Sequence, residues 1–207
     1  MKKSRPRVTA RKPPQQLRSR VTVESILDGA IRVLEQEGSL ALTTTRIAQV
    51  AGVSVGTLYQ YFPNRKSILD ALQEREFQRT LVVMQEVMLE RPIESTDELA
   101  RAVIRGLFKL YGAAPELHRV LVVEGLSGEA PEQVKAFDLR MVSLVRSVLA
   151  GARFTCRRKN VDAAAFIAYQ SVRASMMAHL LEAPAGMDEA TLTDELADLL
   201  HRYLVAS

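Results

Sequence analysis

Cysteine is nearly absent from this sequence of 207 residues, in which Cys156 is the single one. A lone cysteine excludes a disulfide within the chain and fits a reducing compartment. Long apolar runs are missing as well, since no stretch reaches the roughly 18 residues that span a bilayer. The basic N-terminus lacks the apolar core of a secretory signal. We therefore expect a cytoplasmic protein that has no membrane partner.

The residue patterns of enzyme active sites are also missing. The histidines His118, His179 and His201 stand apart from one another and lack the spacing of metal ligands. No glycine-rich phosphate loop, nucleophile elbow or Cys/His motif is present. Cys156 lies in a basic stretch, where a redox sensor and an incidental loop cysteine are both open. We expect no catalysis, no metal and no cofactor.

Positive charge is present but unevenly distributed. Residues 1–66 carry 12 Lys and Arg against 4 acidic residues, a balance of +8, whereas residues 67–207 carry 16 against 20, a balance of −4. This asymmetry indicates a polyanionic partner for the first third of the chain, with a merely solubilising segment as the alternative.

The basic residues begin in a segment that is poor in large apolar groups. Residues 1–18 contain three prolines and many cations, so they bury too little surface to fold, and we predict a disordered basic arm. A solvated tail and an arm that follows phosphates or enters a minor groove both remain open.

Helical periodicity dominates the rest of the sequence. It predicts a first helix over 21–37 that ends at Gly38, and a second helix that runs to residue 51 with Thr43 or Thr44 as its cap. A third helix is predicted over 55–62 with Ser54 as its cap, and a fourth over 65–89. Further helices are expected over 96–111, 116–126, 132–150, 161–181 and 189–204. We predict an all-α chain of about nine helices, with a three-helix domain over 19–66 and a larger helical domain over 67–207.

The short helix expected at 55–62 has an unusual outward face. On a helical wheel, Leu58 and Phe62 share the inward face with Val55 beside them, while Gly56 and Gln60 lie nearly opposite. Thr57 and Tyr59 flank that outward pair. Glycine admits a close approach of another molecule, and amide and hydroxyl groups hydrogen-bond base edges and phosphates.

The preceding helix and turn fit a helix-turn-helix. Ala48 is small where the next helix crosses, Gly52 allows the turn, and Leu58 fills the gap between the two helices. An ordinary helical hairpin is the alternative. These three residues at these offsets, together with the polar outward face, favour a DNA-binding helix-turn-helix.

The stretch GVSVGTLYQYFPNR, which follows TTTRIAQVA, resembles the TetR family of transcriptional regulators. The resemblance covers about residues 19–69, and its pattern G-V-S-x-G-T-L-Y-x-Y-F-x-N-(K/R) is specific to that family. Arg65 stands where the family commonly has Lys, Lys66 stands where relatives often have an acid, and Val33 replaces a usual aromatic.

The resemblance implies roles for individual residues of this segment. Contacts with the DNA backbone or groove edge are implied for Thr44, Thr45 and Ser54; contacts with bases for Val55, Gly56, Thr57 and Gln60; and contacts with phosphates for Tyr59, Tyr61, Arg65 and Lys66. It also implies that the C-terminal domain dimerises and binds a small molecule.

The last two expected helices support dimerisation independently. An apolar stripe on the final helix and small residues on the helix before it can pack against a second copy as a four-helix interface. The alternative is that both stripes close a core within one chain. The predicted interface residues are Ala164, Ala168, Leu192, Leu196, Leu199, Leu200 and Tyr203.

A ligand pocket is predicted from polar and soft apolar residues inside helical segments, although each of them also fits a plain core. Arg173 favours an anionic or carbonyl-bearing ligand, unless Glu124 pairs with it. The candidates are Phe77, Met84, Phe108, Tyr111, His118, Phe137, Met141, Phe166, Tyr169, Arg173 and Met177.

These patterns predict a DNA-binding transcriptional regulator rather than an enzyme. We expect a homodimer that binds a near-palindromic double-stranded DNA operator and is released by a small-molecule effector. Repression is the expected output because an occupied promoter blocks polymerase, and activation stays open. The alternative is a helical protein-interaction module with non-specific affinity for DNA.

Overall fold

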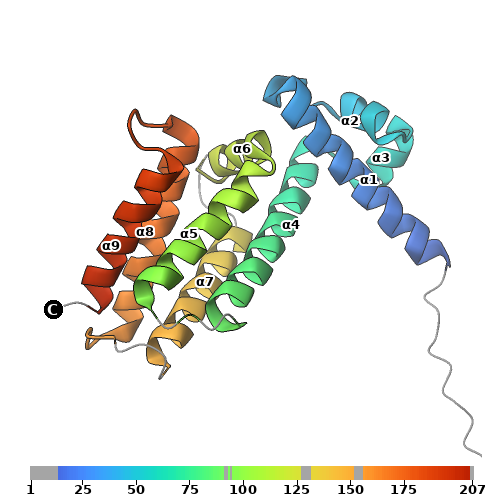
Figure 1. Ribbon diagram of the computed structural model, residues 1–207. Coiled ribbons are helices and arrows are strands. Elements are labelled where there is room, and N and C mark those ends of the chain that lie inside the picture. Colours follow the sequence, from blue (N-terminus) through green and yellow to red (C-terminus); the bar gives the residue numbers. More distant parts are fainter. Residues whose placement is uncertain (1–13, 91–92, 94, 127–131, 152–155, 206–207) are drawn as a thin grey trace, which may run out of the picture. The chain divides into compact units, whose positions relative to one another are not determined.

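The computed structural model describes residues 14–90, 93, 95–126, 132–151 and 156–205, and their regular elements are all helical. The chain divides into two compact units, unit 1 (Met1–Ile68) and unit 2 (Leu69–Ser207), close to the predicted domain boundary. The all-α prediction is therefore confirmed for the described residues (Figure 1).

Unit 1 is built from α1 (Pro14–Glu37), the short 3-10 turn η1 (Ser39–Ala41), α2 (Thr44–Ala51), α3 (Val55–Tyr61) and the start of α4 (Arg65–Gln85). The side chains of Thr43 and Ser54 accept hydrogen bonds from the backbone N–H groups of Arg46 and Thr57. The predicted Ser54 cap is therefore present, and of the two candidates for α2 it is Thr43 that caps the helix. Gly52 has φ 72°, the left-handed conformation that ends α2.

The start of α1 corrects the prediction for the basic arm. The helix begins at Pro14, inside the segment 1–18 that was predicted to be disordered. Proline is favourable at the first position of a helix because its ring fixes a helical φ and its missing N–H has no partner there. The rest of the predicted arm, residues 1–13, lies outside the described residues.

Two contacts fix how α1 crosses α2. Gly29 faces Ala51, and a Cβ at Gly29 would lie 2.9 Å from the Ala51 Cβ. Nearby, Arg32 Nη2 donates a 3.0 Å hydrogen bond to the Val50 carbonyl. The sequence-based interpretation missed both contacts, although they hold the helix-turn-helix against α1.

Unit 2 contains the rest of α4, a π-helical turn η2 (Glu86–Glu90), α5 (Thr96–Gly112), α6 (Pro115–Leu126), α7 (Glu132–Ala150), α8 (Val161–Glu182) and α9 (Glu189–Leu204). These bounds match the predicted helices closely, except that the last turn of the helix predicted over 65–89 widens into η2. Figure 1 shows the long helices of this unit side by side, with α5 packed on α9 and α7 packed on α8.

The core of unit 2 corrects the predicted dimer interface. Five of the seven predicted residues are buried within the single chain, so the intramolecular alternative holds for them: Ala164, Ala168, Leu192, Leu196 and Leu200. The three leucines are buried because α9 turns its apolar stripe toward α5, and the two alanines lie on α8, which packs on α7. Leu199 remains 47% exposed, and Tyr203 is half-buried.

Within the described residues, no helix is long and apolar enough to cross a membrane. The same part of the chain holds no group of three or more His, Cys, Asp or Glu side chains that is arranged to bind a metal ion.

Candidate nucleic-acid interface and ligand cavity

The outward face of α3 is exposed as predicted. Gly56, Tyr59 and Gln60 are exposed, while Leu58 is fully buried and Phe62 is nearly so. Val55 differs from the helical-wheel prediction because its side chain is 37% exposed. As the first residue of the helix it points back toward the N-terminus, away from the core, and so it joins the exposed face.

Glycine at position 56 is not required by the fold. A Cβ there would meet only the Ser54 Oγ, at an ordinary distance of 3.8 Å. Alanine inside a helix stabilises it by about 1 kcal/mol more than glycine does. The glycine therefore weakens α3 without relieving any clash, and its effect is to leave the backbone open to a close approach.

The hydroxyl groups on this face are ordered by one another. Thr44 Oγ1 and the Tyr59 hydroxyl are 3.1 Å apart, which ties the first turn of α2 to α3. Ser54 Oγ accepts from the Thr57 N–H at 2.9 Å and lies 2.8 Å from Thr57 Oγ1. These bonds hold four of the predicted DNA-contacting side chains in fixed positions.

Helix starts in the two units differ in their content of acidic residues. The first turns of α2, α3 and α4 contain no acidic residue, whereas those of α5, α6, α7, α8 and α9 each contain at least one. An acid in the first turn stabilises a helix through its dipole. The first turns of α2 to α4 hold no such acid, and a helix start without one suits an external anion such as phosphate.

The remaining predicted DNA-contacting residues lie at the borders of this face. Thr45 and Lys66 are exposed, and Tyr61 and Arg65 are half-buried. Arg65 and Lys66 are the first two residues of α4. Because cations are unfavourable at the positive end of a helix, this position suits an anionic partner better than it suits helix stability.

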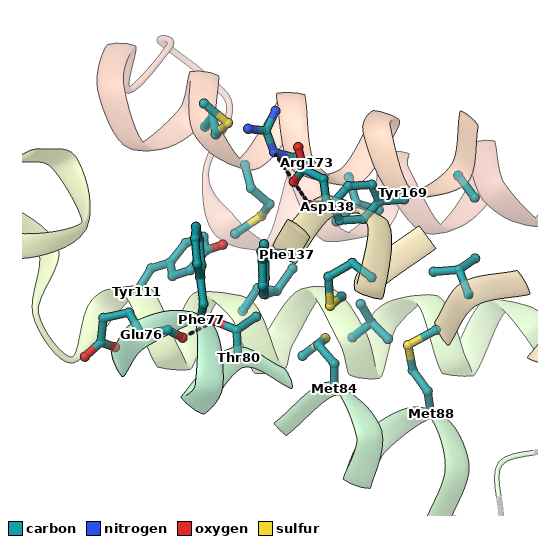
Figure 2. Close-up of a pocket in the computed structure, with 18 of the residues that line it drawn as sticks. Glu76, Phe77, Thr80, Met84, Met88, Tyr111, Phe137, Asp138, Tyr169 and Arg173 are labelled. Atoms are coloured by element: carbon teal, nitrogen blue, oxygen red, sulfur yellow. Dashed lines mark hydrogen bonds and ion pairs between the residues drawn. The ribbon is translucent and has the colours of Figure 1, made fainter. Parts of the chain in front are cut away.

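Unit 2 encloses a cavity of about 490 Å³, lined by residues of α4 to α9 and η2 (Figure 2). Nine of the eleven predicted ligand-binding residues line it: Phe77, Met84, Tyr111, His118, Phe137, Met141, Tyr169, Arg173 and Met177. The structure thus gathers side chains from five helices, predicted separately, around one space.

Two predicted ligand residues lie elsewhere, which corrects their assignment. Phe108 is buried on another side of α5 from Leu107 and Tyr111, where its ring meets His179 edge-on at 5.2 Å. Phe166 is 54% exposed and does not line the cavity, although it shares a stripe of α8 with the cavity-lining Arg173. Apolar composition alone did not distinguish buried positions of these helices from exposed ones.

The cavity also contains two carboxylates that were not predicted. Glu76 is 3% exposed, and its Oε1 lies 3.1 Å from Arg79 Nη1. Its Oε2 lies 3.6 Å from His118 Nε2. The sequence did contain a signal that Glu76 is buried. It stands four residues after buried Leu72 and eight before buried Met84, in one helical stripe.

Asp138 is the second carboxylate, and it is a partner of Arg173 that the sequence did not indicate. The ion pair joins Arg173 Nε to Asp138 Oδ1 at 3.3 Å. The Tyr169 hydroxyl donates a hydrogen bond to the same Asp138 oxygen. Figure 2 shows these three side chains grouped on one wall of the cavity.

Both phenols of the cavity stay protonated at neutral pH. Burial raises the pKa of Tyr111 to about 12. Burial, followed by the hydrogen bond to Asp138, raises the pKa of Tyr169 further above its ordinary value. Each phenol therefore remains a hydrogen-bond donor.

Comparisons with known proteins match both units. Residues 26–72 match the family model described as bacterial regulatory proteins, tetR family, and residues 95–204 match the tetracyclin repressor-like C-terminal domain. The two models thus cover the helix-turn-helix and most of unit 2, the same two regions that the sequence separated by charge.

Individual relatives are more distant. An uncharacterized HTH-type transcriptional regulator of Xanthobacter autotrophicus is 35% identical over 97 residues, 47% of this chain and 46% of the relative. A nucleoid occlusion factor SlmA of Actinobacillus pleuropneumoniae is 30% identical over 129 residues, 62% of this chain and 61% of that protein. The chain thus spans only about half to three fifths of the length of these relatives.

A solved structure extends the likeness across most of the chain. The FadR repressor of Thermus thermophilus, in complex with lauroyl-CoA, superposes with a TM-score of 0.66 at 22% identity. The match covers 89% of this chain and 96% of that one. At this identity the likeness is one of fold.

Proposed function

Since this chain belongs to the TetR family of bacterial regulatory proteins, we propose that it is a repressor that binds operator DNA as a dimer and leaves it when a small molecule binds. The observation that carries the DNA-binding part is the exposed face of α3. Gly56 is left open there although the fold does not need glycine.

The helix starts support DNA as the anionic partner. Helix starts attract phosphate through the helix dipole, and the first turns of α2, α3 and α4 contain no acidic residue that would repel it. Gln60 and Thr57 present an amide and a hydroxyl to base edges, while Tyr59 and Tyr61 reach phosphates. Binding by two copies places two α3 helices about 34 Å apart in successive major grooves.

Exposed apolar side chains on α8 and α9 support the dimer. Phe166 and Ile167 on α8 are 54% and 43% exposed, and Leu199 on α9 is 47% exposed. Large apolar side chains on neighbouring helices are typical of a surface that a second copy covers. We propose these three residues as the dimer interface, in place of the five buried ones.

The helix α4 supports release by a ligand. It starts with Arg65 and Lys66 and continues into unit 2, where Phe77 and Met84 line the cavity. A ligand that favours one orientation of α4 over another shifts the spacing of the two α3 helices, and with it the affinity for DNA. Repression is the expected output because the protein blocks polymerase when it occupies a promoter.

Selection of random duplex DNA with the purified chain tests this function, followed by binding to the selected duplex across a salt series. We expect an inverted repeat with a steep fall in affinity as salt rises. Weak binding that is uniform over all sequences would contradict the proposal and indicate an interaction module with non-specific affinity for DNA.

A further inference from the structure

We infer that the effector of this cavity is an uncharged amphiphile: a flat aromatic ring system that carries a hydroxyl or similar hydrogen-bonding group at one end. The inference rests on the proposed function, because it takes the cavity of unit 2 to be the effector site. Three features of the cavity carry it: its paired charges, its graded polarity and its stacked rings.

The charges of the cavity are already matched. Glu76 has Arg79 at 3.1 Å and His118 at 3.6 Å, and Asp138 has Arg173 at 3.3 Å. A charged ligand would lose its hydration on entering and would have to break one of these pairs to gain a counterion. An uncharged ligand avoids that loss, so the matched charges select against both anions and cations.

Polarity changes along the cavity wall that α4 and η2 provide. Besides Phe77, the lining residues of this wall are, in chain order, Gln73, Glu76, Thr80, Met84 and Met88. Their spacing of three and four residues places them one above another on a single helical face. The wall therefore runs from amide, carboxylate and hydroxyl at one end to thioethers at the other, which fits an amphiphile lying along α4.

The hydroxyl of Tyr111 can hydrogen-bond a ligand near the polar end of the cavity. Figure 2 shows Tyr111 at the same end of the cavity as Glu76, with its hydroxyl directed toward Phe77 and Phe137. Within the described part of the chain this hydroxyl makes no hydrogen bond, and the phenol contacts the His118 ring at 4.8 Å. Because Tyr111 stays protonated, its hydroxyl both donates to and accepts from a ligand hydroxyl.

The rings of Phe77 and Phe137 favour a flat ligand. They stack 4.1 Å apart with an interplanar angle of 6°, and both line the cavity between its polar and thioether ends (Figure 2). A parallel pair presents a flat face, on which an aromatic ring gains offset stacking that an acyl chain does not. Thioethers add favourable sulfur–ring contacts, and five methionines line the cavity: Met84, Met88, Met141, Met176 and Met177.

Three probes of one shape and different charge test the inference. Calorimetric titration of the full chain at pH 7 compares 4-phenylphenol, which is neutral, with 4-phenylbenzoate and 4-phenylbenzylammonium. We expect the phenol to bind at least about tenfold more tightly than either ion, because each ion must be desolvated beside pairs that are already formed. Equal or tighter binding of an ion, or no binding of the phenol, overturns the inference.

Two variants locate the bound probe. Tyr111→Phe should weaken 4-phenylphenol about five- to tenfold and leave biphenyl, which has no hydroxyl, unchanged. Phe137→Leu should weaken both probes alike, because it removes the stacked ring but keeps an apolar side chain. Circular dichroism melting shows whether each variant folds. Equal binding of 4-phenylphenol to the folded Tyr111→Phe variant would contradict the assignment of the hydroxyl.

A separate release assay distinguishes this inference from the proposed function. The selected duplex is incubated with the chain and either 4-phenylphenol or lauroyl-CoA. Release by lauroyl-CoA alone would leave the repressor proposal standing and overturn the ligand class. Calorimetric binding of the phenol by a chain that selects no duplex would support the ligand class and overturn the repressor.

Discussion

Gly29 and Gly56 are both helical glycines of unit 1, but the space around them differs. A Cβ at Gly29 would lie 2.9 Å from the Ala51 side chain and 3.1 Å from its backbone, whereas one at Gly56 would meet only the Ser54 Oγ at 3.8 Å. The first glycine is therefore required by the packing of α1 on α2, and the second is not required by packing at all.

This difference predicts opposite effects of alanine. Gly29→Ala should lower the free energy of unfolding by about 1 to 3 kcal/mol, because the backbone of α2 has to move. Gly56→Ala should leave it unchanged or raise it by up to about 1 kcal/mol, while operator affinity falls because the methyl group holds the DNA away. Urea unfolding and operator titration of both variants check this. A Gly56→Ala variant with full affinity would contradict the proposed close approach.

Tyr59 is predicted to contact phosphate rather than bases. Its hydroxyl is held 3.1 Å from Thr44 Oγ1. Tyr59→Phe should weaken binding to every duplex about fivefold, the effect of one lost hydrogen bond, and leave the preferred site unchanged. Fluorescence anisotropy on the operator and on a scrambled duplex measures both affinities. A loss confined to the operator would instead place Tyr59 against a base.

Single residues show where sequence reasoning succeeded and where it failed. Ser54 and Leu58 were predicted correctly because a cap and a buried plug are local requirements of a short helix. Asp138 was missed because its pairing with Arg173 joins α7 to α8, and no local rule states which helices meet. Phe166 was assigned to the cavity because its neighbours on α8 are also apolar, but its side chain is 54% exposed.

At the scale of elements, an ion pair joins the end of α1 to α2. Arg46 Nη2 lies 2.7 Å from Glu37 Oε1, and Arg46 Nε donates to both carboxylate oxygens at 3.0 and 2.9 Å. The hydrogen bonds from Arg46 lower the pKa of Glu37, and those to Glu37 raise the pKa of Arg46. The pair is partly exposed, at 38% and 31%.

The lowered pKa sets the pH range in which this pair contributes. A carboxylate whose pKa is lower in the folded chain stabilises the fold above its unfolded value of 4.5, and the contribution is lost as pH falls through the folded pKa. Glu37→Gln should therefore melt at a lower temperature than the natural chain at pH 7, with the gap closing at acidic pH. A gap that stays constant below that range would contradict the role of the charge.

Helix bounds were largely predictable because caps and turn residues mark them locally. Ser95, Asn160 and Asp188 each accept a hydrogen bond from the first turn that follows, and these three starts match the prediction. The widened turn η2 was not predictable, since a π-helical turn has no capping signature. The early start of α1 was missed because proline-rich composition was weighed above the tolerance of proline at a first helical position.

At the scale of the whole molecule, the dimer proposal depends on the exposed apolar residues of α8 and α9. Phe166→Glu should convert the dimer to a monomer without altering the cavity, because Phe166 does not line it. Operator affinity should fall with the dimer, by at least about a hundredfold, since one half-site remains. Sedimentation velocity measures the mass.

Leu139 provides the matched control for this substitution. It is 69% exposed on α7 and lies outside the proposed interface, so Leu139→Glu should remain a dimer with full operator affinity. A Phe166→Glu variant that stays dimeric, or a Leu139→Glu variant that dissociates, would place the interface elsewhere. The sequence did not predict this interface. It showed one apolar stripe on α9 but not that α5 covers most of that stripe.

The measurement that tests the central claim most directly is a parallel selection of random duplex DNA with the natural chain and its Gln60→Ala variant. Gln60 lies on the exposed face of α3, where its amide is proposed to contact a base edge. We predict an inverted repeat for the natural chain and, for the variant, relaxed preference at one position in each half-site. If the variant selects the same sites with the same affinity, the exposed face of α3 does not read the operator.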